Sequence, residues 1–268
     1  MIANENNTPW GYMFRKIFVN TILLLLVSSA LSANNDGIDT LYDTAGIDGV
    51  LLISSLSGSV EYQHNAKKVT WANIPASTFK IPNTLIALQE GIIKNQVEII
   101  KWDGVSRQYE PWNSDQTLAT AFSLSCVWCY QRFAVKIGKP TYQKYLNLFD
   151  YGNRKVGDDI STFWLEGDLR VSPRQQINFL RKVYLEELPI AANHFKTLKE
   201  IMLVEDTPDY KVWAKTGWQG EHGWYVGYVE VAGKVWLFAN YIKVKAKSDL
   251  ALRRQLTIEA LKLKGIIN

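Results

Sequence analysis

Residues 75–83 read Pro-Ala-Ser-Thr-Phe-Lys-Ile-Pro-Asn and place a serine and a lysine three positions apart, at Ser77 and Lys80. Residues at this spacing share one face of a helix, so the hydroxyl and the amine are expected to point the same way. Pro82 suits the first turn of such a helix and Gly91 suits its end. A helix start offers unpaired N–H groups and a positive dipole end, which favour an anion beside Ser77. One turn of chain therefore provides a candidate nucleophile, base and oxyanion stabiliser.

Ser-x-x-Lys is a weak signal when it stands alone, because it also describes a serine N-cap followed by a solvated lysine. The neighbouring residues favour the chemical interpretation. Ile74, Pro75, Ala76 and Phe79 surround the pair with apolar side chains, so the lysine is expected to be desolvated.

The composition is that of an ordinary globular protein and permits one large domain or two small ones. The chain has 268 residues, of which 47% are hydrophobic and 21% charged. Its net charge of +4 is too small to indicate a nucleic-acid partner. Ten Trp and thirteen Tyr indicate either an aromatic-lined cleft or an aromatic-rich core.

The first 33 residues are interpreted as a secretory signal region. Arg15 and Lys16 form a basic start, residues 17–27 are apolar, and small residues up to Ala33 suit a cleavage site. Residues 1–12 do not fit such a signal, which makes Met13 a candidate for the true start. The apolar run is short for a membrane span. We therefore expect a periplasmic or secreted protein without stable membrane association after cleavage, with an uncleaved anchor as the alternative.

Two cysteines, Cys126 and Cys129, have the C-x-x-C spacing. They fall within residues 117–137, which predict one long apolar helix ending at Gly138. Mid-helix cysteines favour two buried, unbonded side chains, although a strained disulfide stays open. Reducing agent is then expected to have little effect on activity. A metal site is not expected, because none of the three histidines is near in sequence.

The order of elements predicts an α+β fold, within the broad α/β class. Residues 34–47 are interpreted as a loose leader, and residues 49–62 as a hairpin. Residues from Ser77 to about Asp209 are mainly helical, and three strands follow within 212–242, two of them joined by Ala232-Gly233. A helix over residues 248–264 closes the chain. Both ends should contribute to one antiparallel sheet, with a cleft between the sheet and a helical lobe.

Four short motifs occur in a fixed order. They are Ser77-Thr78-Phe79-Lys80, Ser125-Cys126-Val127, Tyr151-Gly152-Asn153 and Lys215-Thr216-Gly217. Each alone also fits an ordinary helix, turn or strand end. Together they resemble the penicillin-recognising serine enzymes, and the Ser-x-Val and Tyr-Gly-Asn motifs resemble class D (oxacillinase-type) β-lactamases in particular. The resemblance runs from Gly49 to the C-terminus and includes residues 101–104, 163–167 and 252–253.

The resemblance implies a β-lactamase/transpeptidase-like fold, with an antiparallel sheet flanked by terminal helices. A single domain over residues 34–268 would hold a helical lobe over about 82–210. It also implies hydrolysis of β-lactam antibiotics, and hence resistance, through an acyl-enzyme on Ser77. Lys80 would be the general base and would carry CO2 as a carbamate (N6-carboxylysine). Ser125 would pass a proton to the lactam nitrogen, and Trp164 would donate its N–H to the carbamate.

The resemblance further implies a set of substrate-binding residues. Backbone N–H groups of Ser77 and Trp218 would form the oxyanion hole, and Val127 and Leu165 an apolar lid. The residues expected to bind substrate are Lys215, Thr216, Gly217, Trp218, Arg253, Val127, Leu165, Tyr151 and Asn153. No metal and no cofactor other than the CO2 on Lys80 is expected.

Two related functions use the same acylation. One is a penicillin-binding transpeptidase or carboxypeptidase, and the other is a β-lactam sensor domain, which stays acylated. Trp164 and the apolar lid favour the hydrolase over the transpeptidase or carboxypeptidase. A sensor is expected to need membrane segments and a cytoplasmic relay, and the residues before position 15 do not supply them. The expected partners are small β-lactams, and the sequence does not predict an oligomeric state or a preferred β-lactam.

Overall fold

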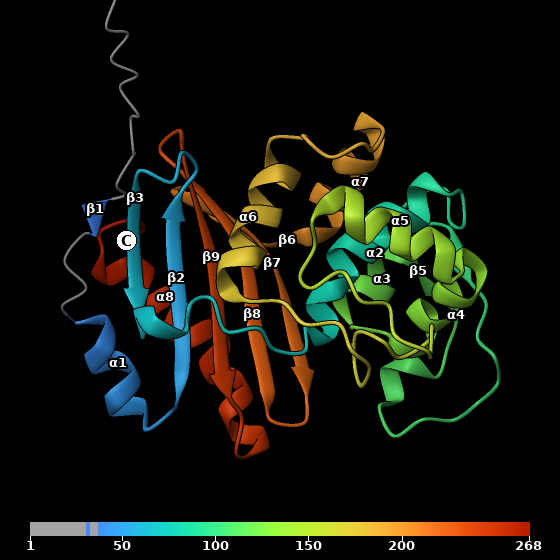
Figure 1. Cartoon of the computed structure of the whole chain (residues 1–268), viewed down its shortest axis with the longest axis horizontal. Coiled ribbons are helices and arrows are strands. Elements are labelled where there is room, and N and C mark those ends of the chain that lie inside the picture. Colours follow the sequence, from blue (N-terminus) through green and yellow to red (C-terminus); the bar gives the residue numbers. More distant parts are fainter. Residues whose placement is uncertain (1–30, 33–36) are drawn as a thin grey trace, which may run out of the picture.

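A seven-stranded sheet forms one half of the molecule, and a mainly helical lobe lies beside it (Figure 1). The structure is a computed structural model that describes residues 31–32 and 37–268. Residues 1–30 and 33–36, which contain Met13 and nearly all of the predicted signal region, lie outside the described residues. Within the described part, no helix is both long and apolar enough to cross a membrane.

The strand order in the large sheet is β1-β3-β2-β9-β8-β7-β6. Its strands are β1 (Leu31–Ser32), β2 (Gly49–Ser55), β3 (Val60–His64), β6 (Leu203–Asp206), β7 (Tyr210–Gln219), β8 (His222–Val231) and β9 (Lys234–Lys243). All neighbours pair antiparallel except β1 and β3, and β2 from the start of the chain pairs with β9 from its end. The predicted α+β class, with both ends of the chain in one sheet, is confirmed.

Helices flank the sheet and fill the lobe. They are α1 (Ile38–Ala45), α2 (Lys80–Gln89), α3 (Leu118–Ser123), α4 (Val127–Ile137), α5 (Lys139–Phe149), α6 (Pro173–Tyr184), α7 (Ala192–Met202) and α8 (Leu252–Leu263). Short 3-10 turns are η1 (Ala66–Lys68), η2 (Ala76–Phe79), η3 (Glu110–Trp112) and η4 (Lys247–Ala251), and β4 (Ile99–Ile100) pairs with β5 (Gln116–Thr117). Figure 1 shows α1 and α8 at the sheet end of the molecule, with α2 to α5 in the lobe.

The two faces of the sheet bury separate cores, because successive side chains of a strand point to opposite faces. Leu51 and Ile53 of β2 belong to the core that contains Leu256 and Leu261 of α8. Their neighbours, such as Leu52, belong to the larger core shared with the helical lobe. The terminal helices therefore cover one face, and the nucleophile turn and the lobe cover the other.

Several local signals in the sequence are confirmed. Ser172 caps α6 in a capping box with Gln175, and Pro173 stands in the first turn. Ala232 and Gly233 both have positive φ, at 47° and 72°, and join β8 to β9. The closing helix is present as η4 followed by α8.

Three expectations about the elements are wrong. The predicted loose leader contains α1, whose Ile38 and Tyr42 lie four apart and pack into the core. The predicted helix over 117–137 is two helices, with a break at Ser125. The helical lobe ends at Met202 because β6 joins the sheet as an edge strand.

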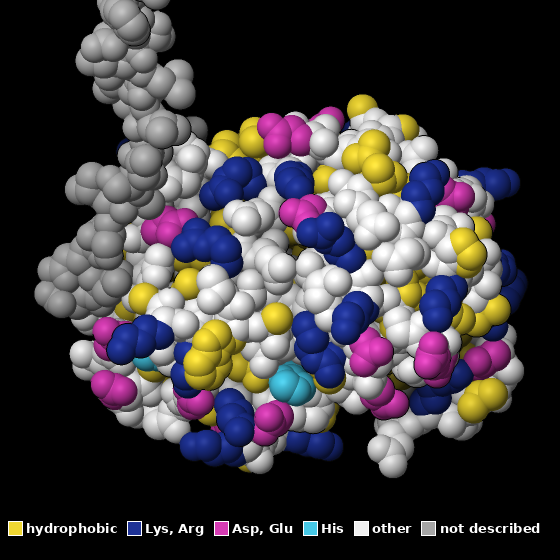
Figure 2. All heavy atoms as spheres, viewed as in Figure 1, with side chains coloured by type: hydrophobic (Ala, Val, Ile, Leu, Met, Phe, Trp, Pro, Cys, Tyr) yellow, Lys and Arg dark blue, Asp and Glu magenta, His cyan; other side chains and the backbone are white. Residues whose placement is uncertain are grey.

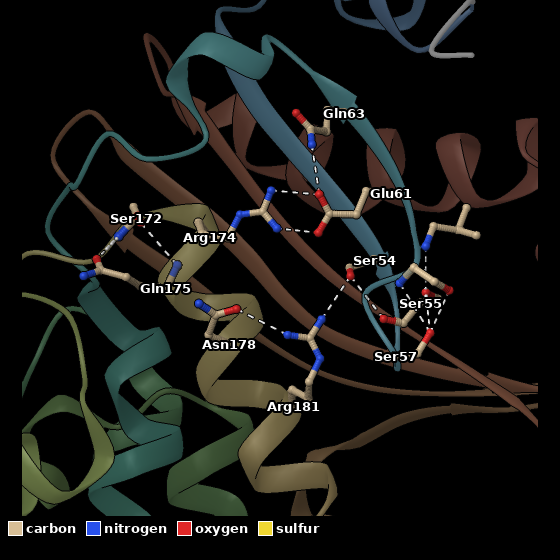
Figure 3. A network of polar contacts seen from close by, with 12 residues as sticks. Ser54, Ser55, Ser57, Glu61, Gln63, Ser172, Arg174, Gln175, Asn178 and Arg181 are labelled. Carbon is tan, nitrogen blue, oxygen red and sulfur yellow. Dashed lines mark hydrogen bonds and ion pairs between the residues drawn. The ribbon is translucent and has the colours of Figure 1, made fainter. Parts of the chain in front are cut away.

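A polar network ties α6 to the β2–β3 hairpin (Figure 3). The two terminal guanidinium nitrogens of Arg174 donate to the buried carboxylate of Glu61, and Arg181 donates to Ser54 Oγ at 3.1 Å. Burial raises the pKa of Glu61, but hydrogen bonds from Arg174, Gln63 and Ser54, together with the Arg174 charge, bring the net pKa below the usual value. The ion pair thus anchors the lobe to the sheet with Glu61 ionised.

Candidate active site

The nucleophile turn is a 3-10 turn that runs directly into a helix. Ser77 lies in η2 and Lys80 begins α2, and Lys80 Nζ donates to Ser77 Oγ at 3.1 Å. Ser77 is not a side-chain cap, because no side-chain cap bond is made at either helix start. Gly91, at φ +67°, directly follows the C-cap of α2. The predicted serine–lysine pair is therefore assembled by one turn of chain.

Lys80 lies in a dry environment. Its side chain is 1% exposed, and its Nζ lies 4.8 Å from the centre of the Tyr130 ring. Burial, and secondly the charge of Lys215, hold the pKa of Lys80 well below its usual range. In the described part of the chain no carboxylate pairs with it. A neutral amine is therefore favoured beside Ser77.

Trp164 lies in the same buried region. It is fully buried, stacks on Phe79 with ring centres 5.7 Å apart, and its carbonyl accepts from the Ala76 N–H at 3.0 Å. Its indole Nε1 has no hydrogen-bond partner among the described residues. A buried N–H without an acceptor is costly, so this donor is expected to meet an anion that the protein binds or forms.

Ser125 and Lys215 meet across the cleft. Lys215 Nζ donates to Ser125 Oγ at 2.5 Å and to the Thr216 carbonyl at 3.1 Å. Burial, with the Arg253 charge second, lowers the pKa of Lys215 to about 7. This lysine can therefore exchange a proton with its surroundings near neutral pH.

Strand β7 runs tightly against the nucleophile turn. A Cβ added at Gly217 would lie 3.0 Å from the Pro75 carbonyl and 3.2 Å from the Thr78 nitrogen. Arg253 of α8 donates to the Gly217 carbonyl at 2.7 Å, and burial lowers the pKa of its guanidinium to about 10. Gly217 therefore permits a close approach that brings the Lys-Thr-Gly strand and Arg253 to Ser77.

A cleft of about 650 Å³ opens at Ser77, and Lys80, Trp164 and Lys215 lie behind its lining. The residues that line it include six of the candidate site residues, namely Ser77, Ser125, Val127, Thr216, Trp218 and Arg253. Gln108, Tyr109, Trp112, Leu124 and Lys247 also line it and were not predicted individually. The high aromatic content was the available signal for Tyr109 and Trp112. Leu165 is 7% exposed, while Val127 is partly exposed at the cleft.

Comparison with known proteins decides the family. The chain matches the penicillin binding protein transpeptidase domain over residues 41–262. It is 40% identical to β-lactamase OXA-48 of Klebsiella pneumoniae over 223 residues, which cover 82% of this chain and 84% of the relative. It is 36% identical to β-lactamase OXA-5 of Pseudomonas aeruginosa over 264 residues, 96% of this chain and 97% of the relative.

Solved class D structures superpose on the fold. The β-lactamase YbXI from Nostoc has a TM-score of 0.83 at 39% identity, with 85% of this chain and 98% of that chain covered. The Sebaldella termitidis enzyme has a TM-score of 0.84 at 37% identity, with 88% and 98% covered. The chain belongs to the class D β-lactamases. It is a serine hydrolase that acts on β-lactams.

In this class D β-lactamase, two of the residues expected to bind substrate lie away from the cleft. Tyr151 is 1% exposed and packs its ring against Phe79 and Phe179. Asn153 donates to the Asp168 carbonyl at 2.8 Å and accepts from the Arg170 N–H at 3.1 Å. The Tyr-Gly-Asn motif therefore supports the loop behind the nucleophile turn, and we do not include it in the substrate site.

The two cysteines of the class D β-lactamase are bonded, contrary to the favoured expectation. A disulfide joins Cys126 to Cys129, and Cys126 is the N-cap of α4, not a mid-helix residue. Ser125, just before it, has a left-handed φ of 55°. Such a conformation costs about 1–3 kcal/mol in a residue other than glycine, so the surrounding structure must hold it. The disulfide closes the turn that carries Ser125 and Val127.

Replacing both cysteines by alanine is expected to lower kcat/KM about tenfold. The bond encloses only four residues, so in the chain-entropy model its loss costs about 2 kcal/mol of unfolding free energy. The larger effect should be local, because Ser125 can then leave its strained conformation and its contact with Lys215. Thermal unfolding and kcat/KM would be measured on the same samples. An unchanged kcat/KM with a lowered Tm would show that the bond only adds stability.

Brief treatment of native enzyme with dithiothreitol tests a different point. Both cysteines are fully buried, so reductant reaches them slowly. The expectation that reductant has little effect thus stays a prediction, although its original reason, the absence of a bond, is wrong.

Proposed function

We propose that the chain opens β-lactams by acylation of Ser77, with Lys80 as the general base in its carbamate form. The observation that carries this proposal is the buried contact between Lys80 Nζ and Ser77 Oγ, and the unpartnered indole N–H of Trp164, which stacks on Phe79 of the same turn, supports it. A base within hydrogen-bonding reach of a nucleophile is what activation of serine requires.

The residues around Lys80 fit a carbamate. Only a neutral amine reacts with CO2, and burial favours that form of Lys80. Trp164 Nε1 would donate to the carbamate, and Val127 and Leu165 would shield it from water. Bound there, the group supplies a carboxylate-type base at neutral pH.

The positions of the side chains support the following acylation step. Ser77 Oγ attacks the lactam carbonyl carbon and gives up its proton on the side of Lys80. The C–N bond of the lactam breaks, and Ser125 passes its hydroxyl proton to the departing nitrogen. Lys215, which donates to Ser125, restores that proton. Backbone N–H groups of Ser77 and Trp218 would stabilise the oxyanion.

The ring carboxylate of the substrate would bind at Lys215, Thr216 and Arg253. Guanidinium and carboxylate pair strongly through parallel hydrogen bonds. Arg253 is held for this role by its bonds to the carbonyls of Gly217 and Leu250, both 2.7 Å.

A nitrocefin turnover assay with and without bicarbonate tests the mechanism. Steady multiple turnover that bicarbonate increases is expected. A single burst without turnover would instead indicate a transpeptidase-like or sensor-like protein that stays acylated. Turnover that is indifferent to bicarbonate under strict CO2 depletion would remove the carbamate from the mechanism.

We also propose export to the periplasm through the signal region at residues 15–33. Mass spectrometry of periplasmic protein is expected to find a mature chain that starts near residues 31–34. Cleavage after Ala33 would remove β1 and leave β3 as the edge of the sheet. A mature protein that retains residues 23–27 would instead indicate a membrane anchor.

A further inference from the structure

The cleft holds one cation more than the proposed reaction uses. Arg253 and Lys247 both line it, and Lys215 reaches it through Ser125. None of the residues that line this cleft is an aspartate or a glutamate. One side of the cleft is therefore positively charged without a compensating carboxylate. The outer surface drawn in Figure 2 differs, because basic and acidic side chains are interspersed over it.

Lys247 is the unused cation. It begins η4, the 3-10 turn that leads into α8, and stands six residues before Arg253. Within residues 37–268 its side chain has no hydrogen-bond or ion-pair partner. Its neighbours differ, since Lys243 pairs with Glu221 at 3.2 Å and Lys245 donates to the Gly46 carbonyl at 3.5 Å. The ammonium of Lys247 is therefore available to a ligand in the cleft.

We propose that Lys247 forms a second anion subsite, for an anionic group on the carboxylate side of the bicyclic substrate. The proposal rests on the placement of the ring carboxylate at Arg253 made above. In a cephalosporin the carboxylate is on C4, and C4 is bonded to C3, which bears the variable substituent. A sulfonate or carboxylate on that substituent is then close to the ring carboxylate that we place at Arg253, and Lys247 lines the same cleft on the turn that leads into the helix of Arg253. An anion on the acylamino side chain lies at the opposite end of the substrate.

Cefamandole and cefonicid test this subsite because they share the mandeloyl side chain and differ in one sulfonate on the C3 tetrazole. The quantity measured is the ratio of kcat/KM for cefonicid to that for cefamandole, obtained in competition with nitrocefin. This parameter covers the steps up to acylation, in which the C3 substituent is still attached. Lys247→Gln is expected to lower this ratio about two- to fivefold, which is the size of effect of an exposed ion pair. High salt screens such a pair and should reduce the difference in the ratio between wild type and variant.

Two controls distinguish a specific subsite at Lys247 from a general electrostatic effect of removing one positive charge. Lys245→Gln removes the same charge two residues away, outside the cleft lining, and should leave the ratio unchanged. Carbenicillin and benzylpenicillin differ by one carboxylate on the acylamino side, and Lys247→Gln should leave their ratio unchanged. A fall in the cephalosporin ratio with Lys247→Gln alone supports the subsite. An equal fall with Lys245→Gln, an equal fall for the penicillin pair, or no fall at all overturns it.

Binding to a Ser77→Ala background keeps the inference separate from the hydrolytic mechanism. Trp112 and Trp218 line the cleft, so tryptophan fluorescence can report binding of cefamandole and cefonicid without turnover. The preference is the ratio of the Kd for cefamandole to the Kd for cefonicid. A smaller preference in Ser77→Ala/Lys247→Gln than in Ser77→Ala supports the subsite. This result would hold even if the wild type did not turn over nitrocefin. Equal preference in both overturns the subsite while leaving β-lactam hydrolysis intact.

Discussion

Replacing Ser77 with alanine is expected to lower kcat for penicillin hydrolysis by at least about 10⁴-fold, as for removal of a serine nucleophile in other hydrolases. The fold should survive. The Ser77 hydroxyl makes no cap bond. Its oxygen accepts one hydrogen bond, which Lys80 Nζ donates. Loss of one such bond changes the unfolding free energy by about 1 kcal/mol. Steady-state kinetics and thermal unfolding would be recorded side by side.

Ser123→Ala is the matched control. Ser123 lines the same cleft, but its hydroxyl donates to the Thr120 carbonyl at 3.2 Å and has no part in the proposed chemistry. Its activity should stay within about twofold of wild type, since surface substitutions without a special role have small effects. Substantial hydrolysis by Ser77→Ala would exclude this serine as the nucleophile. Comparable losses in both variants would point to damage of the cleft as a whole.

The second large effect concerns Lys80 and its surroundings. In CO2-depleted buffer at mildly acidic pH, turnover is expected to fall and to recover on adding bicarbonate near neutrality. The sign follows from the lowered pKa of Lys80, whose first cause is burial and whose second is the charge of Lys215. The lowered pKa favours the neutral amine, and only the neutral amine reacts with CO2. Acid releases CO2 and protonates the freed amine.

Trp164→Phe should strengthen this dependence. Phenylalanine keeps the stacking on Phe79 but removes the indole N–H. Deacylation should therefore slow about 100-fold, which is the size of effect expected for loss of a positioned base. Acylation should slow by a smaller factor. The expected trace is a burst followed by a stall that bicarbonate relieves. Trp213→Phe is the control, because Trp213 is also buried, at 5% exposure, but stacks on Tyr228 and does not line the cleft. If carbon-13 NMR with labelled bicarbonate showed no carbamate in the wild type, Lys80 would act as a plain amine.

Local chemistry made much of this molecule predictable from sequence. The capping box at Ser172, the positive-φ pair at Ala232-Gly233 and the helix after Ser77 depend on residues close in the chain. The residues that determine each of these features therefore lie within a few positions of one another in the sequence. The same holds for the serine–lysine pair, whose spacing alone sets the shared helix face.

The features that were not predicted depend on partners far away or on bonds that periodicity does not encode. The break at Ser125 lies inside an apolar run with helical spacing, and a disulfide and bonds back to α3 create it. Tyr151 reads as part of a turn, yet packing against Phe79 and Phe179 buries it. Lys247 belongs to no motif, and only the approach of η4 to the cleft gives it a role.

The pairing of β2 with β9 has a consequence for how the enzyme is made. Gly49 lies opposite Ile242, so the centre of the sheet cannot form until almost the whole chain has been synthesised. Ser77 emerges early, whereas Lys215 and Arg253 come from the last quarter of the chain. Contacts between such distant segments also form slowly during folding. A partly folded chain therefore carries the serine without its binding site, which is complete only when β7 and the C-terminal helix have docked.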